Sequence, residues 1–172
     1  MSNNDLNCSV ALALDFIGDN WSLLILRDFM VFGGTRRFEQ LREGLNISRN
    51  VLTERLKTLV DQEIIRKSPV EEGGRRMQYK LSRKGWDLTP MLAAINQWCI
   101  RWRPDPINSA FEFVDSEHRK EIDVVTIRSQ DGRVLGPPDI RVVPRTDAAR
   151  AYFSSFKTPF SAKSQSEPEF GL

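Results

Sequence analysis

The chain has little cysteine and almost no histidine, with two cysteines and one histidine in 172 residues. Cys8 and Cys99 are too few and too far apart for a disulfide framework, and His118 has no cysteine neighbour with which to share a metal ion. The chain also lacks a nucleophile-elbow signature, a phosphate-binding loop and paired histidines. We therefore expect no metal, no cofactor and no enzymatic activity.

Long apolar runs are also missing. The N-terminus carries aspartates and lacks the cationic start and apolar stretch of a signal peptide, and no run approaches the roughly 20 apolar residues that span a bilayer. We therefore expect a cytoplasmic protein with no membrane partner. Hydrophobic residues make up 40% of the chain and charged residues 28%, which is ordinary globular usage. The length suits one main domain with a substantial extension.

The charge balance is mildly basic, with a formal net charge of +2 and a pI near 8.7. Such a balance permits binding to nucleic acid but does not require it. The distribution of the charges is more informative, because bases clearly outnumber acids between Arg36 and Lys84. This excess directs attention to the middle of the chain.

Two helices are predicted at the start of the chain. Residues 8–18 are apolar at helical spacing and end at a glycine. The next helix can be capped by Asp19 or Asn20, and it is apolar on every side over residues 23–26. This pattern predicts a buried central helix.

A closely linked pair of helices follows. Residues 37–45 carry apolar side chains at spacings of three and four, and a brief turn separates them from Ser48, a good N-cap for a third helix. Leu52, Leu56 and Leu59 fall on one side of that third helix. Two helices joined by so short a turn predict a helix-turn-helix.

The opposite side of the third helix supplies candidate DNA contacts. In a helix-turn-helix the second helix lies in the major groove, where its first side chains reach the base edges. Arg49 could pair with guanine and Asn50 with adenine, while Lys57 is better placed for a phosphate. The alternative is an ordinary solvated helix face. The candidates for this recognition helix are Ser48, Arg49, Asn50, Thr53 and Lys57.

A β-hairpin is predicted next, with strands over residues 64–70 and 77–82 that flank a glycine turn. Arginines at its tip could reach the minor groove or the DNA backbone, as the wing of a winged helix does. The alternative is a tip with no function, which the adjacent Glu71 and Glu72 favour. The candidate wing and backbone contacts are Arg37, Arg75, Arg76 and Lys80.

A single long helix with a wide apolar stripe is predicted over residues 82–103, and two prolines after it end the helix. The stripe could pack against the rest of the chain, or it could form a dimer interface with the first helix. A dimer would place two recognition helices about 34 Å apart on one face of DNA. The candidate dimer contacts are Leu88, Leu92, Ile95, Trp98, Cys99 and Trp102.

The remainder of the chain is expected to form a small β-rich extension. Strands are predicted over residues 111–116, 121–129, 133–135 and 139–143, with a turn at 130–132, and a short helix is predicted over 146–156. The polar, proline-bearing end is expected to be disordered. The predicted domains are thus a DNA-binding and dimerisation domain over residues 1–103, the extension over 104–156 and the tail over 157–172.

The ordered motifs resemble the HxlR family of winged helix regulators. The resemblance lies in IGDNWSLLILRD after Cys8, in RFEQLREGLNIS, in ISRNVLTERLKTLVDQEII and in YKLSRKGWDLTPML, and it covers residues 8–102. It implies an α+β fold, a winged helix-turn-helix with a flanking dimerisation helix, to which this chain adds a small C-terminal β extension. Most members end soon after the long helix, so the extension departs from the family pattern.

The resemblance also implies a function. We expect a homodimeric transcriptional regulator that binds double-stranded DNA at a pseudo-palindromic operator, acts as a repressor and responds to a small molecule or a redox signal. Cys8 matches a cysteine that senses oxidants in some members, and a small apolar filler in the dimer interface explains it equally well. The alternative function is a winged-helix protein-docking module without specific DNA readout.

Overall fold

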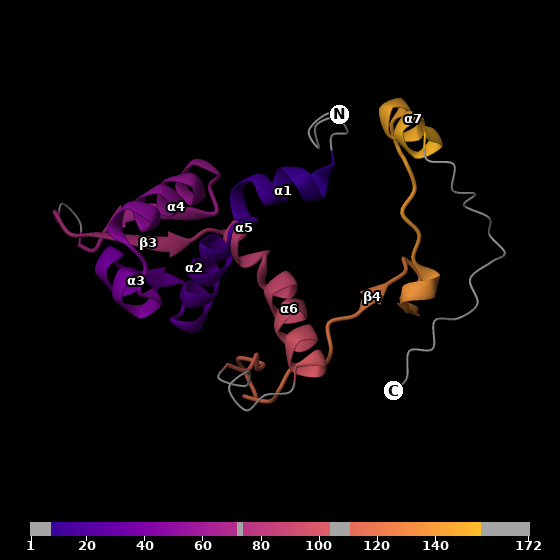
Figure 1. Cartoon of the computed structure of the whole chain (residues 1–172). Coiled ribbons are helices and arrows are strands. Elements are labelled where there is room, and N and C mark those ends of the chain that lie inside the picture. Colours follow the sequence, from indigo (N-terminus) through magenta and orange to yellow (C-terminus); the bar gives the residue numbers. More distant parts are fainter. Residues whose placement is uncertain (1–7, 72–73, 104–110, 156–172) are drawn as a thin grey trace.

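The computed structural model describes residues 8–71, 74–103 and 111–155 (Figure 1). Its first part is a helical body with a three-stranded sheet, and a thinner extension leads away from the end of the last long helix. The elements of the first part are α1 (Ser9–Ile17), α2 (Asn20–Val31), β1 (Thr35–Arg36), α3 (Phe38–Leu45), α4 (Arg49–Asp61), β2 (Ile65–Pro69), β3 (Met77–Leu81), α5 (Arg83–Trp86) and α6 (Thr89–Trp102).

Two side-chain caps fix where the central helices begin. Asp19 is the N-cap of α2, and its carboxylate accepts hydrogen bonds from the amides of Trp21 at 2.9 Å and Ser22 at 3.0 Å. Ser48 is the N-cap of α4, and its hydroxyl accepts a hydrogen bond from the amide of Val51 at 3.4 Å. Because the first amides of a helix have no partner within the helix, such caps stabilise its start by about 1 kcal/mol. The predicted caps are confirmed.

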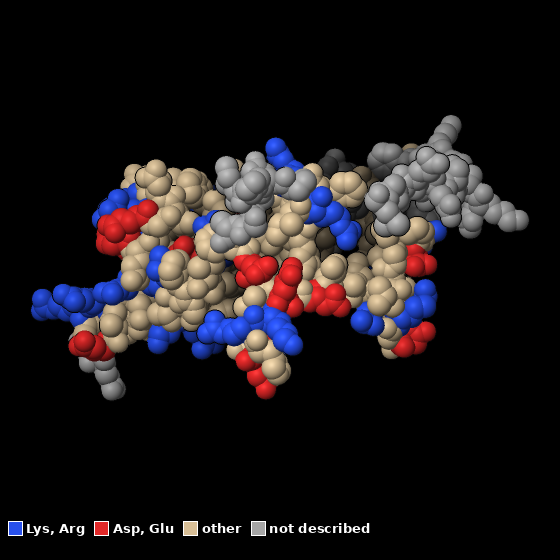
Figure 2. All heavy atoms as spheres, turned by 90° about the horizontal axis from the view of Figure 1, so that it is seen from below, with Lys and Arg blue, Asp and Glu red and all other residues tan. Residues whose placement is uncertain are grey.

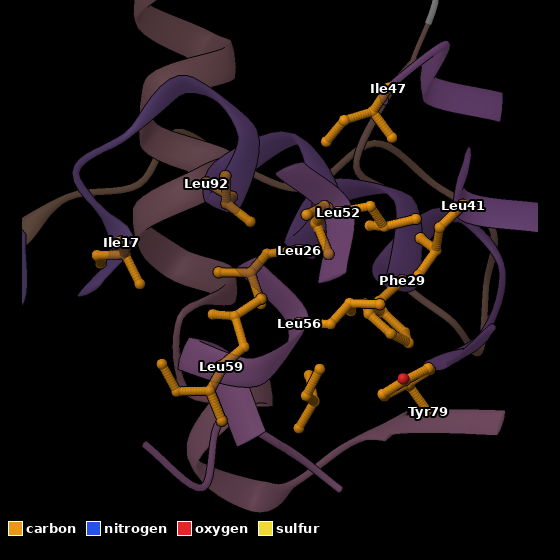
Figure 3. Packing of buried hydrophobic residues seen from close by; sticks show 13 residues of the cluster. Ile17, Leu26, Phe29, Leu41, Ile47, Leu52, Leu56, Leu59, Tyr79 and Leu92 are labelled. Carbon is orange, nitrogen blue, oxygen red and sulfur yellow. The ribbon is translucent and has the colours of Figure 1, made fainter. Parts of the chain in front are cut away.

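The hydrophobic core gathers around α2, as the uniformly apolar middle of that helix predicts. Ile25, Leu26 and Phe29 of α2 are fully buried, and Tyr79 of β3 closes the core on the side of the sheet (Figure 3). Helix α4 packs its apolar side, formed by Leu52, Leu56 and Leu59, into this core. The core therefore holds α4 with its opposite side facing solvent.

The sheet is antiparallel with the order β1, β3, β2. Arg66 of β2 lies opposite Lys80 of β3, and Lys67 lies opposite Tyr79. The hairpin of β2 and β3 confirms the predicted pair of strands. Strand β1 was not predicted, because two residues after a glycine pair are too short to show a pattern.

A buried ion pair links α2 to β1 and α3. Arg36 Nε lies 2.8 Å from Asp28 Oδ2, and the two side chains are only 11% and 7% exposed. Arg36 also donates a hydrogen bond to the carbonyl oxygen of Gln40 at 3.2 Å, and its guanidinium lies over the ring of Phe32. The pair thus joins three elements beside the core.

The single long helix predicted over residues 82–103 is wrong, because two helices occupy this region. Helix α5 begins at the cap of Ser82, whose hydroxyl accepts a hydrogen bond from the amide of Gly85. Helix α6 begins at Thr89 and carries Pro90 in its first turn. Proline has no amide hydrogen and clashes with a preceding helical turn, so it is tolerated at the start of a helix but not inside one.

The extension holds less β-structure than predicted. The hairpin predicted across the turn at 130–132 is confirmed but short, because only β4 (Ile127–Arg128) pairs with β5 (Val134–Leu135). The strand predicted over residues 139–143 is wrong, and the one predicted over 111–116 is reduced to an isolated bridge between Val114 and Glu121. Strand propensity needs a partner strand, and here the amide of Val125 donates instead to the side chain of Gln97 on α6. A 3-10 turn, η3 (Pro137–Asp139), and α7 (Asp147–Ser155), which matches the predicted short helix, complete the extension.

The predicted disordered tail over residues 157–172 lies outside the described residues. Within the described ranges, no single helix is long and apolar enough to span a membrane. Only α1 and α2 taken together reach that length and composition, across a bend of 78°. In the same ranges, no three His, Cys, Asp or Glu side chains gather in a way that could hold a metal ion.

Candidate nucleic-acid interface

A tight turn joins α3 to α4 and sets the angle of the helix pair. Asn46 ends α3 in the left-handed conformation with φ of 49° and ψ of 43°, which asparagine adopts more readily than most residues. The amides of Asn46 and Ile47 donate to carbonyl oxygens at the end of α3, and Ile47 is buried. The turn is therefore pinned to the core, and it presents the first residues of α4 outward.

The predicted recognition residues lie on the exposed side of α4. Arg49, Asn50, Thr53 and Lys57 are all exposed, on the side opposite the buried leucines, and the Ser48 side chain caps the helix. The hydroxyl of Thr53 donates to the carbonyl oxygen of Arg49 at 2.8 Å, so its oxygen remains available as an acceptor. This side of α4 offers a guanidinium, an amide, a hydroxyl and an ammonium group over a little more than two helical turns.

Arg49 is held in place by residues of α3. Its Nη2 lies 2.6 Å from Oε1 of Glu39, and its guanidinium lies over the ring of Phe38, with 5.1 Å from Cζ to the ring centroid. Glu39 binds Arg42 as well, with 2.6 Å from Oε2 to Nε. Hydrogen bonds from Arg42 and Arg49 hold the pKa of Glu39 below its usual range, so its charge persists at neutral pH.

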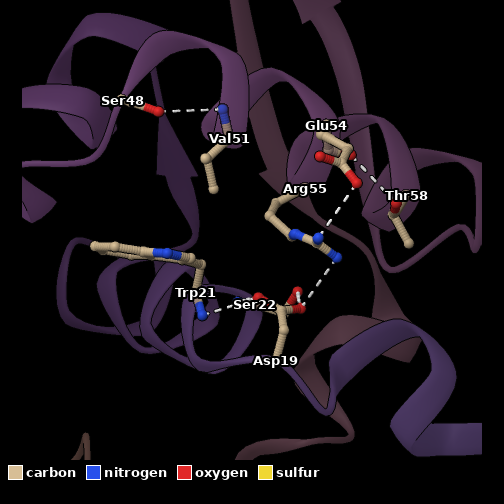
Figure 4. Close-up of polar contacts among 8 residues, drawn as sticks. All are labelled: Asp19, Trp21, Ser22, Ser48, Val51, Glu54, Arg55 and Thr58. Carbon is tan, nitrogen blue, oxygen red and sulfur yellow. Dashed lines mark hydrogen bonds and ion pairs between the residues drawn. The ribbon is translucent and has the colours of Figure 1, made fainter.

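The inner side of α4 is tied to the start of α2 (Figure 4). Arg55 Nη1 lies 3.5 Å from Asp19 Oδ2, and Arg55 Nη2 lies 3.2 Å from Glu54 Oε1. Partial burial raises the pKa of Asp19, but hydrogen bonds from the hydroxyl and amide of Ser22 and the amide of Trp21, with the charge of Arg55, bring it below its usual value. The carboxylate that caps α2 therefore also holds α4 in place.

The hairpin of β2 and β3 forms a wing with a basic tip. Arg75 and Arg76 are exposed there, and the amide of Val70 donates to the carbonyl oxygen of Arg76 at 2.8 Å. In Figure 2, Lys and Arg atoms project at the left end of the molecule, where the wing lies, with acidic atoms beside them. The positive charge thus extends beyond the body of the fold.

The outer face of the wing carries a base that sequence reasoning missed. Arg66 lies directly opposite Lys80 in the sheet, and both are exposed, so the two like charges share one face. The alternation of residues in β2 would have placed Arg66 outward once Ile65 was assigned to the core. Arg37, also proposed as a backbone contact, is exposed at the N-cap of α3, and its amide donates to the side chain of Gln40.

The proposed dimer stripe divides into an inner and an outer part. Leu92 is 8% exposed and belongs to the core of its own chain, and Leu88 packs against that core. Cys99 is half-buried. The remaining three side chains are large, apolar and well exposed: Ile95 at 46%, Trp98 at 62% and Trp102 at 58%.

Helix α1 presents a second apolar surface. Val10, Leu12 and Leu14 are exposed on it, and Figure 1 places α1 and α6 at the end of the body that is remote from the wing. Cys8 is exposed at the N-cap of α1, where its side chain makes no capping hydrogen bond. These two helices thus carry exposed apolar side chains at the end of the helical body away from the wing.

A capped helix pair with an exposed polar face, followed by a basic hairpin, defines a winged helix-turn-helix. Residues 16–106 match the family described as HxlR-like helix-turn-helix, which is more than half of the chain. The chain belongs to the HxlR-like family of helix-turn-helix transcriptional regulators.

Known proteins similar to this chain carry the same class of name. An uncharacterised HTH-type transcriptional regulator from Mycobacterium tuberculosis is 38% identical over 98 residues, which are 57% of this chain and 61% of that protein. The crystal structure of PA1607, provisionally assigned as a transcription factor, superposes with a TM-score of 0.73 and 34% identity, over 84% of this chain and all of that chain. The redox regulator HypR, in its oxidised form, superposes with a TM-score of 0.50 and 25% identity over 56% of this chain and 98% of its own.

The two structural matches differ in extent. The match to HypR covers 56% of this chain, whereas the match to PA1607 covers 84% and must include part of the extension. The extension is therefore not peculiar to this chain. The matched region spans about three fifths of the length of the mycobacterial relative.

Proposed function

We propose that the chain is a homodimeric repressor that binds a pseudo-palindromic operator through α4 and the wing. The observation that carries this proposal is the exposed side of α4, where Arg49, Asn50, Thr53 and Lys57 form one polar surface at the start of the second helix of a helix-turn-helix. Arginine and asparagine are the residues that best read guanine and adenine in the major groove. The exposed bases of the wing supply contacts to phosphates on either side.

The direct test measures binding of the whole chain to promoter fragments, beginning with the DNA beside its own gene. We expect an electrophoretic shift with one fragment that random DNA of equal length competes for poorly. The affinity should fall steeply with salt, because lysine and arginine contacts release counterions from the phosphates. If no genomic fragment binds better than random DNA at moderate salt, the proposal is wrong, and the winged helix then serves to dock a protein.

The wing is expected to contribute affinity without selectivity. Replacing Arg75 and Arg76 with alanine together should weaken binding to every sequence by a similar factor. It should lower the slope of log affinity against log salt by about 2, one for each lost phosphate contact. The matched control is Arg141→Ala with Arg145→Ala, the same change of charge at exposed positions in the extension. Equal effects of the two double variants on the slope would exclude a specific role for the wing.

The exposed apolar faces support a dimer formed by α1 and α6. A single winged helix contacts too little DNA for tight specific binding, and a two-fold dimer would present two copies of α4 to successive major grooves. Three exposed large apolar residues on α1 and four on α6 are more than a solvated surface normally gathers at one end of a body. A second copy with the same faces would bury them.

The dimer can be tested at Trp98. We expect Trp98→Asp to yield monomers at micromolar concentrations in light scattering, because the change places an unpaired charge in an apolar interface. The affinity of this variant for the operator should also fall. Val142→Asp is the control, because Val142 is 74% exposed and lies outside α1 and α6. A monomeric wild-type chain, or a Trp98→Asp dimer, would contradict this interface.

Redox sensing by Cys8 remains a prediction. In its support, Cys8 is exposed and lies at the N-terminus of α1, and the chain resembles a redox regulator over the helix-turn-helix. If Cys8 is instead a small apolar residue that fills space in the dimer interface, a partner copy must cover it. The position of Cys8 beside the proposed dimer helix suits both functions.

A further inference from the structure

The ion pair between Glu39 and Arg49 joins α3 to the first residue of α4, among the candidate DNA contacts. Both side chains are exposed, Arg49 at 65% and Glu39 at 51%, and an exposed pair of this kind adds little to stability. An acidic residue at this position would also repel the DNA backbone if its charge were not balanced. Its presence therefore needs a reason connected with binding.

The contacts of Glu39 fix the side-chain conformation of Arg49 and balance its positive charge. The carboxylate binds Nη2 of Arg49 on one oxygen and Nε of Arg42 on the other, so it is fixed from α3 while it holds a residue of α4. The ring of Phe38 lies under the same guanidinium. An arginine carries five N–H donors, and the described contacts of Arg49 engage only Nη2, which leaves Nε and Nη1 for a second acceptor.

We propose that Glu39 is a positioning residue that gives the recognition helix its sequence selectivity, by orienting Arg49 towards a base edge while it neutralises the charge of Arg49 towards phosphates. This inference rests on the proposed function. A guanine edge offers two neutral acceptors, N7 and O6, at fixed positions, which an oriented guanidinium can reach together. A phosphate attracts any mobile positive charge, whatever the sequence, so neutralisation lowers binding to random DNA more than binding to the operator.

The experiment uses the full chain and a duplex that the wild-type chain itself enriches from a randomised library. Affinities for this duplex and for a random duplex of equal length are measured by fluorescence anisotropy between 50 and 200 mM salt. We expect Glu39→Gln to bind the random duplex at least about threefold more tightly, with a slope of log affinity against log salt that is steeper by about 1. Its affinity for the enriched duplex should not rise. The ratio of the two affinities should therefore fall at least threefold.

Glu43→Gln is the matched control. Glu43 lies on the same helix, is 70% exposed and contacts Arg42 at 3.4 Å, but its described contacts do not include Arg49. The control removes the same charge, so it should raise both affinities alike and leave their ratio unchanged. In an Arg49→Ala background, Glu39→Gln should no longer lower the ratio.

The outcomes separate this inference from the proposed function. If the library yields no enriched duplex, both fail. If a duplex is enriched but Glu39→Gln and Glu43→Gln change the ratio equally, or if Glu39→Gln lowers the ratio as much without Arg49 as with it, the chain reads DNA but Glu39 does not position Arg49. A loss of discrimination confined to the base pair that Arg49→Ala also relaxes supports the assignment.

Discussion

Replacing Asn50 with alanine is expected to lower the affinity for the operator by about 5- to 150-fold, which corresponds to roughly 1–3 kcal/mol for one bidentate base contact. Binding to random DNA should barely change. Asn50 is the second residue of α4 and is exposed, and no hydrogen bond from its side chain is found among the described residues, so its amide is available to an adenine edge. The measurement is a titration of both duplexes at one salt concentration.

A substitution on the same helix provides the contrast. Lys57→Ala, about two turns further along α4, should weaken binding to every sequence alike and lower the salt slope by about 1, because its ammonium group suits a phosphate. Asn50→Ala should leave the slope unchanged, and the stability of both variants should stay within about 0.5 kcal/mol of the parent. If Asn50→Ala weakens operator and random DNA equally, Asn50 does not read a base.

Replacing Arg36 with alanine is expected to lower the free energy of unfolding by about 3–5 kcal/mol, because the change leaves the carboxylate of Asp28 buried without its partner. The cost also includes the hydrogen bond to the carbonyl oxygen of Gln40 and the contact with the ring of Phe32. Urea unfolding followed by circular dichroism measures it. A loss this large would consume much of the stability of an ordinary domain.

Two further variants test the cause. Arg83→Ala removes an arginine that is 92% exposed and pairs with Asp87 at 3.4 Å, so it should cost no more than about 0.5 kcal/mol. Adding Asp28→Asn to Arg36→Ala should restore part of the lost stability, since no buried charge then lacks a partner. If the double variant is less stable than Arg36→Ala alone, the loss comes from packing and not from charge.

Local patterns predicted the helix-turn-helix and its caps because the deciding interactions lie within a few residues. Ser48 and Asp19 each bind amides two or three positions ahead, and the leucines of α4 repeat at helical spacing. The break between α5 and α6 could also have been read from Pro90. In the extension, the local hairpin across residues 130–132 was predicted, but the longer strands were not formed, because strand formation depends on partners elsewhere in the chain. The amide of Val125 donates to a glutamine side chain of α6 instead.

The candidate site was predictable in composition but not in its contacts. The exposed position of Arg49 and Asn50 follows from helical periodicity, because the buried leucines fix which side of α4 faces outward. The ion pair of Arg49 with Glu39 joins residues ten positions apart, so only the angle between α3 and α4 brings them together. The facing pair of Arg66 and Lys80 depends on the register of the hairpin, and the sequence of the two strands leaves that register open.

The register of the wing has an evolutionary consequence. Five consecutive residue pairs, from Ile65 with Leu81 to Pro69 with Met77, determine which side chains face outward before the chain reaches the tip. Insertions, deletions or charge changes beyond Pro69 can therefore accumulate without turning Arg66 or Lys80 towards the core. Descendants of this chain could alter the length and charge of the tip, and hence their preference among DNA sites, while they inherit the rest of the binding surface unchanged.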